Sequence, residues 1–128
     1  MQIDKSHPLT ILLVEDSPAQ ALRLKTNLEQ DGHHVHWVET GRDGLQLASE
    51  KVFELIILDI ELPDIDGFQV CRRLKNDPKV ADIPVIMLTA RDRAEDALKG
   101  LDNGAIDYIP KDNFADIVLS ETIKQMGL

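Results

Sequence analysis

The stretch Phe53–Asp59 (Phe-Glu-Leu-Ile-Ile-Leu-Asp) restricts the possible folds more than any other part of this 128-residue chain. Its short aliphatic run ends at an acid and is followed by Pro63 and Gly67, which predicts a strand buried on both faces. Open parallel sheets bind their ligands at the carboxyl ends of such strands, so Asp59 lies where a functional group is expected. Taken alone, Asp59 could equally serve only to turn the chain.

Four further strand patterns alternate with helical patterns along the chain. The expected strands are Leu9–Val14, His34–Val38, Phe53–Asp59, Ile83–Thr89 and Ala105–Ile109. The expected helices run from Pro18 to a stop at Gly32, from Gly41 to Glu50, from Gly67 to about Asn76, from Arg91 to Leu101, and from a cap at Asp112 or Asn113 to about Met126. This alternation predicts an α/β protein with one doubly wound, five-stranded parallel sheet and five helices.

Length and charge narrow the possible classes of function. The chain is long enough for one domain with its own core, residues 9–128, after a loose polar tail at residues 1–8. A formal net charge of -9 argues against direct binding to nucleic acid or to an anionic membrane. No apolar run reaches membrane-spanning length and the amino terminus has no apolar signal core, so we expect a cytoplasmic protein.

Polar residues gather where the expected strands end. They are Glu15 and Asp16 after the first strand, Asp59 after the third, Thr89 at the end of the fourth and Lys111 just past the fifth. Two carboxylates about 4 Å apart repel by roughly 4 kcal/mol at an effective dielectric constant near 20, so a bound cation is expected. Oxygen ligands without Cys or His favour magnesium or manganese over zinc.

The same set of residues suits phosphoryl transfer. A cation neutralises phosphoryl oxygens, a lysine pairs with another, and an aspartate oxygen attacks in line. Each residue alone has a simpler explanation as a cap, a turn residue or a surface charge. All five explanations would have to hold together at one edge of the sheet, which makes a functional site the better interpretation.

Four motifs around these residues resemble those of response-regulator receiver domains in two-component signalling. They are Leu12–Ser17 (Leu-Leu-Val-Glu-Asp-Ser), Leu58–Gly67 (Leu-Asp-Ile-Glu-Leu-Pro-Asp-Ile-Asp-Gly), Pro84–Ala90 (Pro-Val-Ile-Met-Leu-Thr-Ala) and Gly104–Lys111 (Gly-Ala-Ile-Asp-Tyr-Ile-Pro-Lys). The resemblance extends over Leu9–Met126. It implies a flavodoxin-like fold with strand order 2-1-3-4-5.

The resemblance also implies roles for the acidic residues. Asp59 is expected to be the phosphorylated residue. Asp16 and Asp59, with the backbone carbonyl of Glu61, are expected to bind Mg²⁺ directly, with Mn²⁺ as a possible substitute. Glu15 is expected to hold the ion through water.

Four other residues receive roles from the same resemblance. Lys111 is expected to pair with the phosphoryl group and Thr89 to move and bond it. Tyr108 is expected to swing inward behind Thr89, and Ala90 to leave room for the phosphodonor. The family usually has Pro after this lysine, whereas this chain has Asp112, so the sequence leaves open whether the peptide after Lys111 is cis, as is common at this place, or trans.

The function implied is a phosphorelay switch that catalyses only its own phosphorylation and dephosphorylation. Its expected partners are a histidine kinase or histidine phosphotransfer protein, and a downstream protein that binds the face of the fourth helix, fifth strand and fifth helix. Two alternatives stay open. A receiver-like module that signals without phosphate would fail to bind magnesium, and an Asp-nucleophile phosphohydrolase would release phosphate over many turnovers.

Three other features receive structural interpretations. His34 and His36 share a strand face but lack a Cys or acid at metal-ligand spacing, so we expect ordinary strand histidines. The single tryptophan, Trp37, is expected to pack in the core or at an edge. The last helix carries an apolar stripe that is expected for the most part to face the sheet. Its members are Phe114, Ile117, Val118 and Ile123.

Overall fold

The computed structural model describes residues 8–89, 94–111 and 115–126, with the side chains of residues 89 and 94–96 excepted. Its strands are β1 (Thr10–Val14), β2 (His34–Val38), β3 (Leu55–Leu58), β4 (Val85–Thr89) and β5 (Asp107–Pro110). Its helices are α1 (Pro18–Gln30), α2 (Gly41–Glu50), α3 (Gly67–Lys75), α4 (Ala94–Asp102) and α5 (Ala115–Gln125). Strands and helices alternate as the sequence predicts, with boundaries that differ by a few residues. Within the described ranges, no helix has the length and apolar composition needed to cross a membrane.

The five strands form one parallel sheet in the order β2-β1-β3-β4-β5. This confirms the predicted fold and strand order. The central strand β3 is covered on both faces, and its four residues are each 0% exposed. All five strands point the same way, so their carboxyl ends meet along one edge of the sheet.

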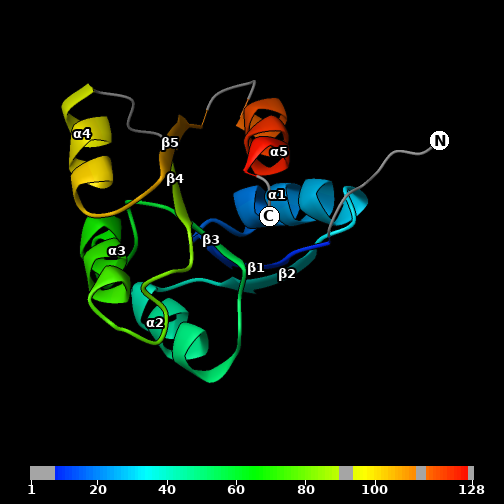
Figure 1. Cartoon of the computed structure of the whole chain (residues 1–128). Helices are drawn as coiled ribbons and strands as arrows, with labels where there is room; N and C mark the ends of the chain where they lie inside the picture. The colour runs from blue at the N-terminus through cyan, green and yellow to red at the C-terminus, as the bar shows by residue number, and fades with distance from the viewer. Residues whose placement is uncertain (1–7, 90–93, 112–114, 127–128) are drawn as a thin grey trace.

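Helices cover both faces of this sheet. Figure 1 shows α1 and α5 together on one side, and α2, α3 and α4 following one another along the other. Each face has its own apolar cluster: one joins β1 and β3 to α1 and α5, and the second joins them to α2 and α3. The two layers hold the strand ends in a fixed arrangement.

Local signals in the sequence set where the helices begin. The Ser17 side chain accepts from the backbone N–H of Gln20 at the start of α1, directly before Pro18. Thr40 caps α2 in the same way. Asp66 Oδ1 accepts from the Phe68 N–H at 2.6 Å at the start of α3. These three caps end the loops that follow β1, β2 and β3. Each loop is therefore fixed where it enters the next helix.

The expectation for the apolar stripe of α5 is wrong. Ile117 and Val118 are 63% and 44% exposed, whereas Ile123 is buried, and Phe114 lies outside the described residues. The buried residues of α5 are Ala115, Leu119 and Ile123, spaced four apart. At about 100° per residue, Ile117 lies about 200° around the helix from Ala115 and so faces away from the sheet.

Candidate functional site

Glu15 and Asp59 stand side by side because their strands are neighbours. The backbone N–H of Glu15 donates to the Val38 carbonyl at 3.0 Å, and that of Asp59 donates to the Val14 carbonyl at 3.0 Å. These bonds extend the sheet one residue past β1 and β3. The two acids are only 1% and 6% exposed. Buried acids are uncommon unless they are paired, so their partners need to be identified.

Lys111 is the partner of both acids. Its ammonium donates to Glu15 Oε1 in a short hydrogen bond and to Asp59 Oδ2 at 3.1 Å. The Lys111 side chain is 14% exposed and reaches the acids from the residue after β5. One cation that follows the fifth strand therefore compensates two carboxylates that follow the first and third strands.

Asp16 adds a third carboxylate to this group. Carboxylate oxygens of Glu15, Asp16 and Asp59 all lie within 4.8 Å of one another, and Asp16 is exposed whereas the other two are buried. Glu61 lines the same cavity of about 200 Å³, together with Ser17, Gln20 and Lys111. Three acids that converge on one cavity fit a divalent cation with oxygen ligands, of which Mg²⁺ and Mn²⁺ are the usual examples.

Burial and neighbouring charges affect Glu15 in opposite directions. Burial raises the pKa of the Glu15 carboxyl, Lys111 and the Ser17 N–H lower it, and the Asp59 charge raises it again. The net direction is upward, so desolvation exceeds the help from Lys111. A divalent cation beside the acids would stabilise their ionised forms, which is a further reason to regard this as a metal site.

Asp64 holds the loop between β3 and α3 in place. Its carboxylate accepts from the backbone N–H groups of Gly41 at 2.8 Å and Arg42 at 2.9 Å, at the amino terminus of α2. Burial raises the pKa of the Asp64 carboxyl, but these two N–H groups, together with those of Asp64 and Ile65, outweigh it, so the net direction is downward. Within the loop, the Glu61 N–H donates to Asp59 Oδ1 at 3.3 Å. The segment that carries Glu61 is therefore tied both to α2 and to Asp59.

The other predicted site residues lie farther along the same edge of the sheet or outside the described residues. Thr89 is the last residue of β4, paired with Pro110, and its side chain is not described. Ala90 and the Lys111–Asp112 peptide bond fall outside the described residues. Tyr108 is half-buried on β5 and packs against the apolar cluster on the α2–α3 side. It is not among the residues that line the acidic cavity.

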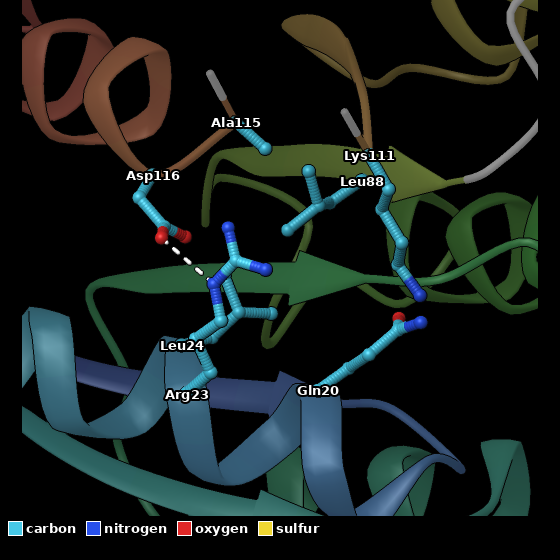
Figure 2. A pocket seen from close by; sticks show the side chains of 7 residues that line it. All are labelled: Gln20, Arg23, Leu24, Leu88, Lys111, Ala115 and Asp116. Atoms are coloured by element: carbon cyan, nitrogen blue, oxygen red, sulfur yellow. Dashed lines mark hydrogen bonds and ion pairs between the residues drawn. The ribbon is translucent and has the colours of Figure 1, made fainter. Parts of the chain in front are cut away.

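A second cavity, of about 180 Å³, adjoins the first between α1 and α5. Gln20 and Lys111 line both cavities, and Figure 2 shows their side chains pointing toward each other. Farther along, Arg23 Nε donates to Asp116 Oδ2 at 2.9 Å and joins the two helices. The sequence interpretation omitted Gln20, because no strand end or motif points to it.

Trp37 is the second residue that sequence reasoning missed. It packs against the apolar cluster on the α1–α5 side, as expected, but its indole Nε1–H also donates to the backbone carbonyl of Glu15 at 2.7 Å. The tryptophan is thus one bond away from the most buried acid of the site. The spacing of residues in the sequence does not predict a hydrogen bond from a side chain on β2 to the backbone carbonyl of the residue that follows β1.

Comparison with known proteins decides the family. The family model described as "Response regulator receiver domain" matches residues 11–124 of this chain. The chain belongs to this family. The receiver domain of a signal transduction histidine kinase from Syntrophus aciditrophicus has 40% sequence identity and a TM-score of 0.83, over 91% of this chain and 88% of that one.

Two further relatives differ in how much of their length this receiver domain matches. It is 45% identical over 101 residues to the DNA-binding dual master transcriptional regulator RpaA of a Synechocystis strain, which is 79% of this chain but 42% of that protein. This receiver domain thus spans less than half the length of that relative. The Mn²⁺-bound form of response regulator Rcp1 has 25% identity and a TM-score of 0.77, over 89% of this chain and 88% of that one.

Proposed function

We propose that Asp59 accepts a phosphoryl group from the phosphohistidine of a histidine kinase or histidine phosphotransfer protein, in an Mg²⁺-dependent step. The observation that carries the proposal is the buried Asp59 carboxylate, paired with Lys111 and adjacent to two further acids. An Asp59 oxygen attacks phosphorus, a P–O bond forms while the P–N bond of the donor breaks, and the imidazole leaves.

The neighbouring groups have separate tasks in this step. Glu15, Asp16, Asp59 and the backbone carbonyl of Glu61 would hold the cation, Glu15 through water. When bound, the cation neutralises charge on the phosphoryl oxygens. Lys111, whose ammonium already donates to Asp59 Oδ2, takes another phosphoryl oxygen and keeps the acyl phosphate close to β5.

The conformational switch uses residues at the end of β4 and on β5. Thr89 bonds the phosphoryl group, Ala90 leaves the donor room to approach, and Tyr108 moves inward behind Thr89. Tyr108 already lies close to α4, because a Cβ built on Gly100 would be 3.3 Å from its Cδ2 atom. A movement of Tyr108 therefore changes the packing of α4 directly.

The face formed by α4, β5 and α5 suits a downstream partner. These elements and the turn between them carry exposed large apolar residues, which in a soluble domain often mark a binding surface. They are Leu98, Leu101, Ile106, Ile117 and Val118. Hydrogen exchange tests the coupling: phosphorylation should change exchange in α4, β5 and α5 but not in α2. Unchanged exchange in α4 and β5 would contradict the switch.

Labelling with a small acyl phosphate tests the phosphorylation itself. With Mg²⁺ present, the parent chain should gain the mass of one phosphoryl group, and Asp59→Asn should gain none. Asp82→Asn, at an exposed position between α3 and β4, is the matched control and should label like the parent. If Asp59→Asn labels as well as the parent, the assignment is wrong. Sustained hydrolysis of a free phosphate ester would instead support a phosphohydrolase.

A further inference from the structure

Glu15 is anchored at all four of its polar positions. Its N–H donates to the Val38 carbonyl at 3.0 Å and its own carbonyl accepts from Trp37 Nε1 at 2.7 Å. Its Oε2 accepts from the Ser17 N–H at 3.1 Å, and its Oε1 accepts from Lys111. The carbonyl belongs to the peptide that joins Glu15 to Asp16. The indole therefore fixes the orientation of the bond between two of the three clustered acids.

Trp37 is well placed for this task because its half-buried ring packs against the core. It lies on β2 opposite Leu13 and packs against the apolar cluster that α1 and α5 cover. A tryptophan ring has few rotatable bonds, so a packed indole directs its N–H with little freedom. Trp37 does not line the acidic cavity, and any effect on a ligand there has to pass through Glu15.

Asp16 depends on this peptide more than the other acids do. Glu15 and Asp59 are buried and bonded to Lys111, whereas Asp16 is exposed and follows the end of β1. The direction of its carboxylate is set chiefly by the backbone that leads to it. Without the indole N–H, the Glu15 carbonyl loses its donor, and the peptide can rotate to find water.

We propose that Trp37 is a positioning residue for the metal site, since its Nε1–H orients the Glu15–Asp16 peptide and so directs the Asp16 carboxylate toward the cation. This inference rests on the proposed function, in which these acids bind Mg²⁺. Groups that orient metal ligands from outside the coordination sphere typically change metal affinity about 10- to 100-fold when removed. The expected loss here is about tenfold, at the lower end, because the effect is on one of several ligands.

The chain offers a sharp test because it contains a single tryptophan. Biosynthetic replacement with 3-benzothienylalanine changes only this position and puts sulfur where the Nε1–H was, with the ring shape retained. Replacement with 5-fluorotryptophan keeps the N–H and is the matched control. The Mg²⁺ dissociation constant is measured by titration calorimetry for the parent and both forms, and the melting temperature is measured in EDTA.

The fluorotryptophan form should bind Mg²⁺ like the parent, and the benzothienyl form about tenfold more weakly. A role in packing alone would lower the melting temperature and leave the dissociation constant unchanged, and that result overturns the inference. Trp37→Phe also lacks the N–H and should show the same loss, which gives a second variant if the benzothienyl chain does not fold. Absence of Mg²⁺ binding by the parent would instead contradict the proposed function.

Discussion

Gly67 lies so close to the backbone of Asp59 that a Cβ on it would be 2.1 Å from the Asp59 carbonyl oxygen. The Gly67 N–H also donates to the Ile60 carbonyl at 2.8 Å. The first turn of α3 is therefore packed directly against the backbone that carries the proposed phosphoacceptor. Any side chain at Gly67 has to push Asp59 and α3 apart.

Gly67→Ala should destabilise the fold by about 2–4 kcal/mol, because the clash is with backbone atoms rather than with a flexible side chain. It should also reduce labelling of Asp59 by an acyl phosphate. Urea unfolding and intact mass measure the two effects. Gly100→Ala is the control, since its Cβ meets the Met87 and Tyr108 side chains at 3.2 and 3.3 Å and its change should stay within about 1 kcal/mol. Equal stability changes in both variants would contradict this account.

Lys111→Met should have opposite effects on stability and on metal binding. Removing the ammonium leaves Glu15 and Asp59 without their cation, so the metal-free chain should lose about 3 kcal/mol of stability. The same change removes a competing positive charge, so Mg²⁺ should bind more tightly, by roughly five- to tenfold. Melting temperatures with EDTA and with Mg²⁺ measure both. Lys79→Met, at an exposed position, should change neither; an unaltered Mg²⁺ affinity in Lys111→Met would contradict the proposed competition.

The sequence was sufficient for the fold and for which residues meet at one edge of the sheet, for a geometrical reason. Alternating strands and helices allow few arrangements other than a parallel sheet, and such a sheet brings all carboxyl ends to one edge. Glu15, Asp59 and Lys111 are distant in sequence, yet the structure joins them through ion pairs as their positions after three strands require. Asp16 and Glu61 follow because they adjoin those strand ends.

Two features could not be predicted from the sequence: which face of α5 is buried, and the hydrogen bond of Trp37. Both depend on tertiary contacts that the spacing of apolar residues does not determine. In α5, apolar residues occur on several sides, and only packing on the sheet selects Ala115 and Leu119 over Ile117 and Val118. The bond from Trp37 to the Glu15 carbonyl depends on the register of β1 and β2 and on one rotamer. Such details arise in the tertiary structure, where packing overrides local preference.

Trp37 should report on the acidic cavity through its fluorescence. Because its Nε1–H is bonded to the Glu15 carbonyl, a cation that shifts Glu15 or Asp16 changes the surroundings of the indole. Mg²⁺ should therefore change the emission of the parent with the same midpoint that calorimetry gives. Asp16→Asn should move the midpoint to higher Mg²⁺ or abolish the change. Emission that stays constant while calorimetry records binding would show that the indole is not linked to the site.

His33 ties the opposite end of β1 to the turn after α1. Its Nδ1 accepts from the Leu9 N–H at 3.0 Å, so in the folded chain this nitrogen carries no proton. Burial lowers the pKa of the His33 imidazole, and the nearby Asp31 and Glu54 only partly offset this. Protonation of Nδ1 would place two donors against each other and break the bond.

Stability should therefore fall as the pH drops below the ordinary histidine pKa of about 6.5. The sign follows from the lowered pKa: the unfolded chain binds the proton more readily, so the contribution of His33 is full above about pH 6.5 and is lost as the pH falls through the folded-state value. His33→Asn offers an oxygen acceptor that does not titrate. The free energy of unfolding, measured with urea, should therefore fall less between about pH 7 and pH 5 than in the parent, by up to about 1 kcal/mol. The exposed neighbour variant His34→Asn should keep the slope of the parent. A His33→Asn chain whose stability falls with pH as steeply as the parent would show that the Leu9 bond does not depend on the protonation of this imidazole.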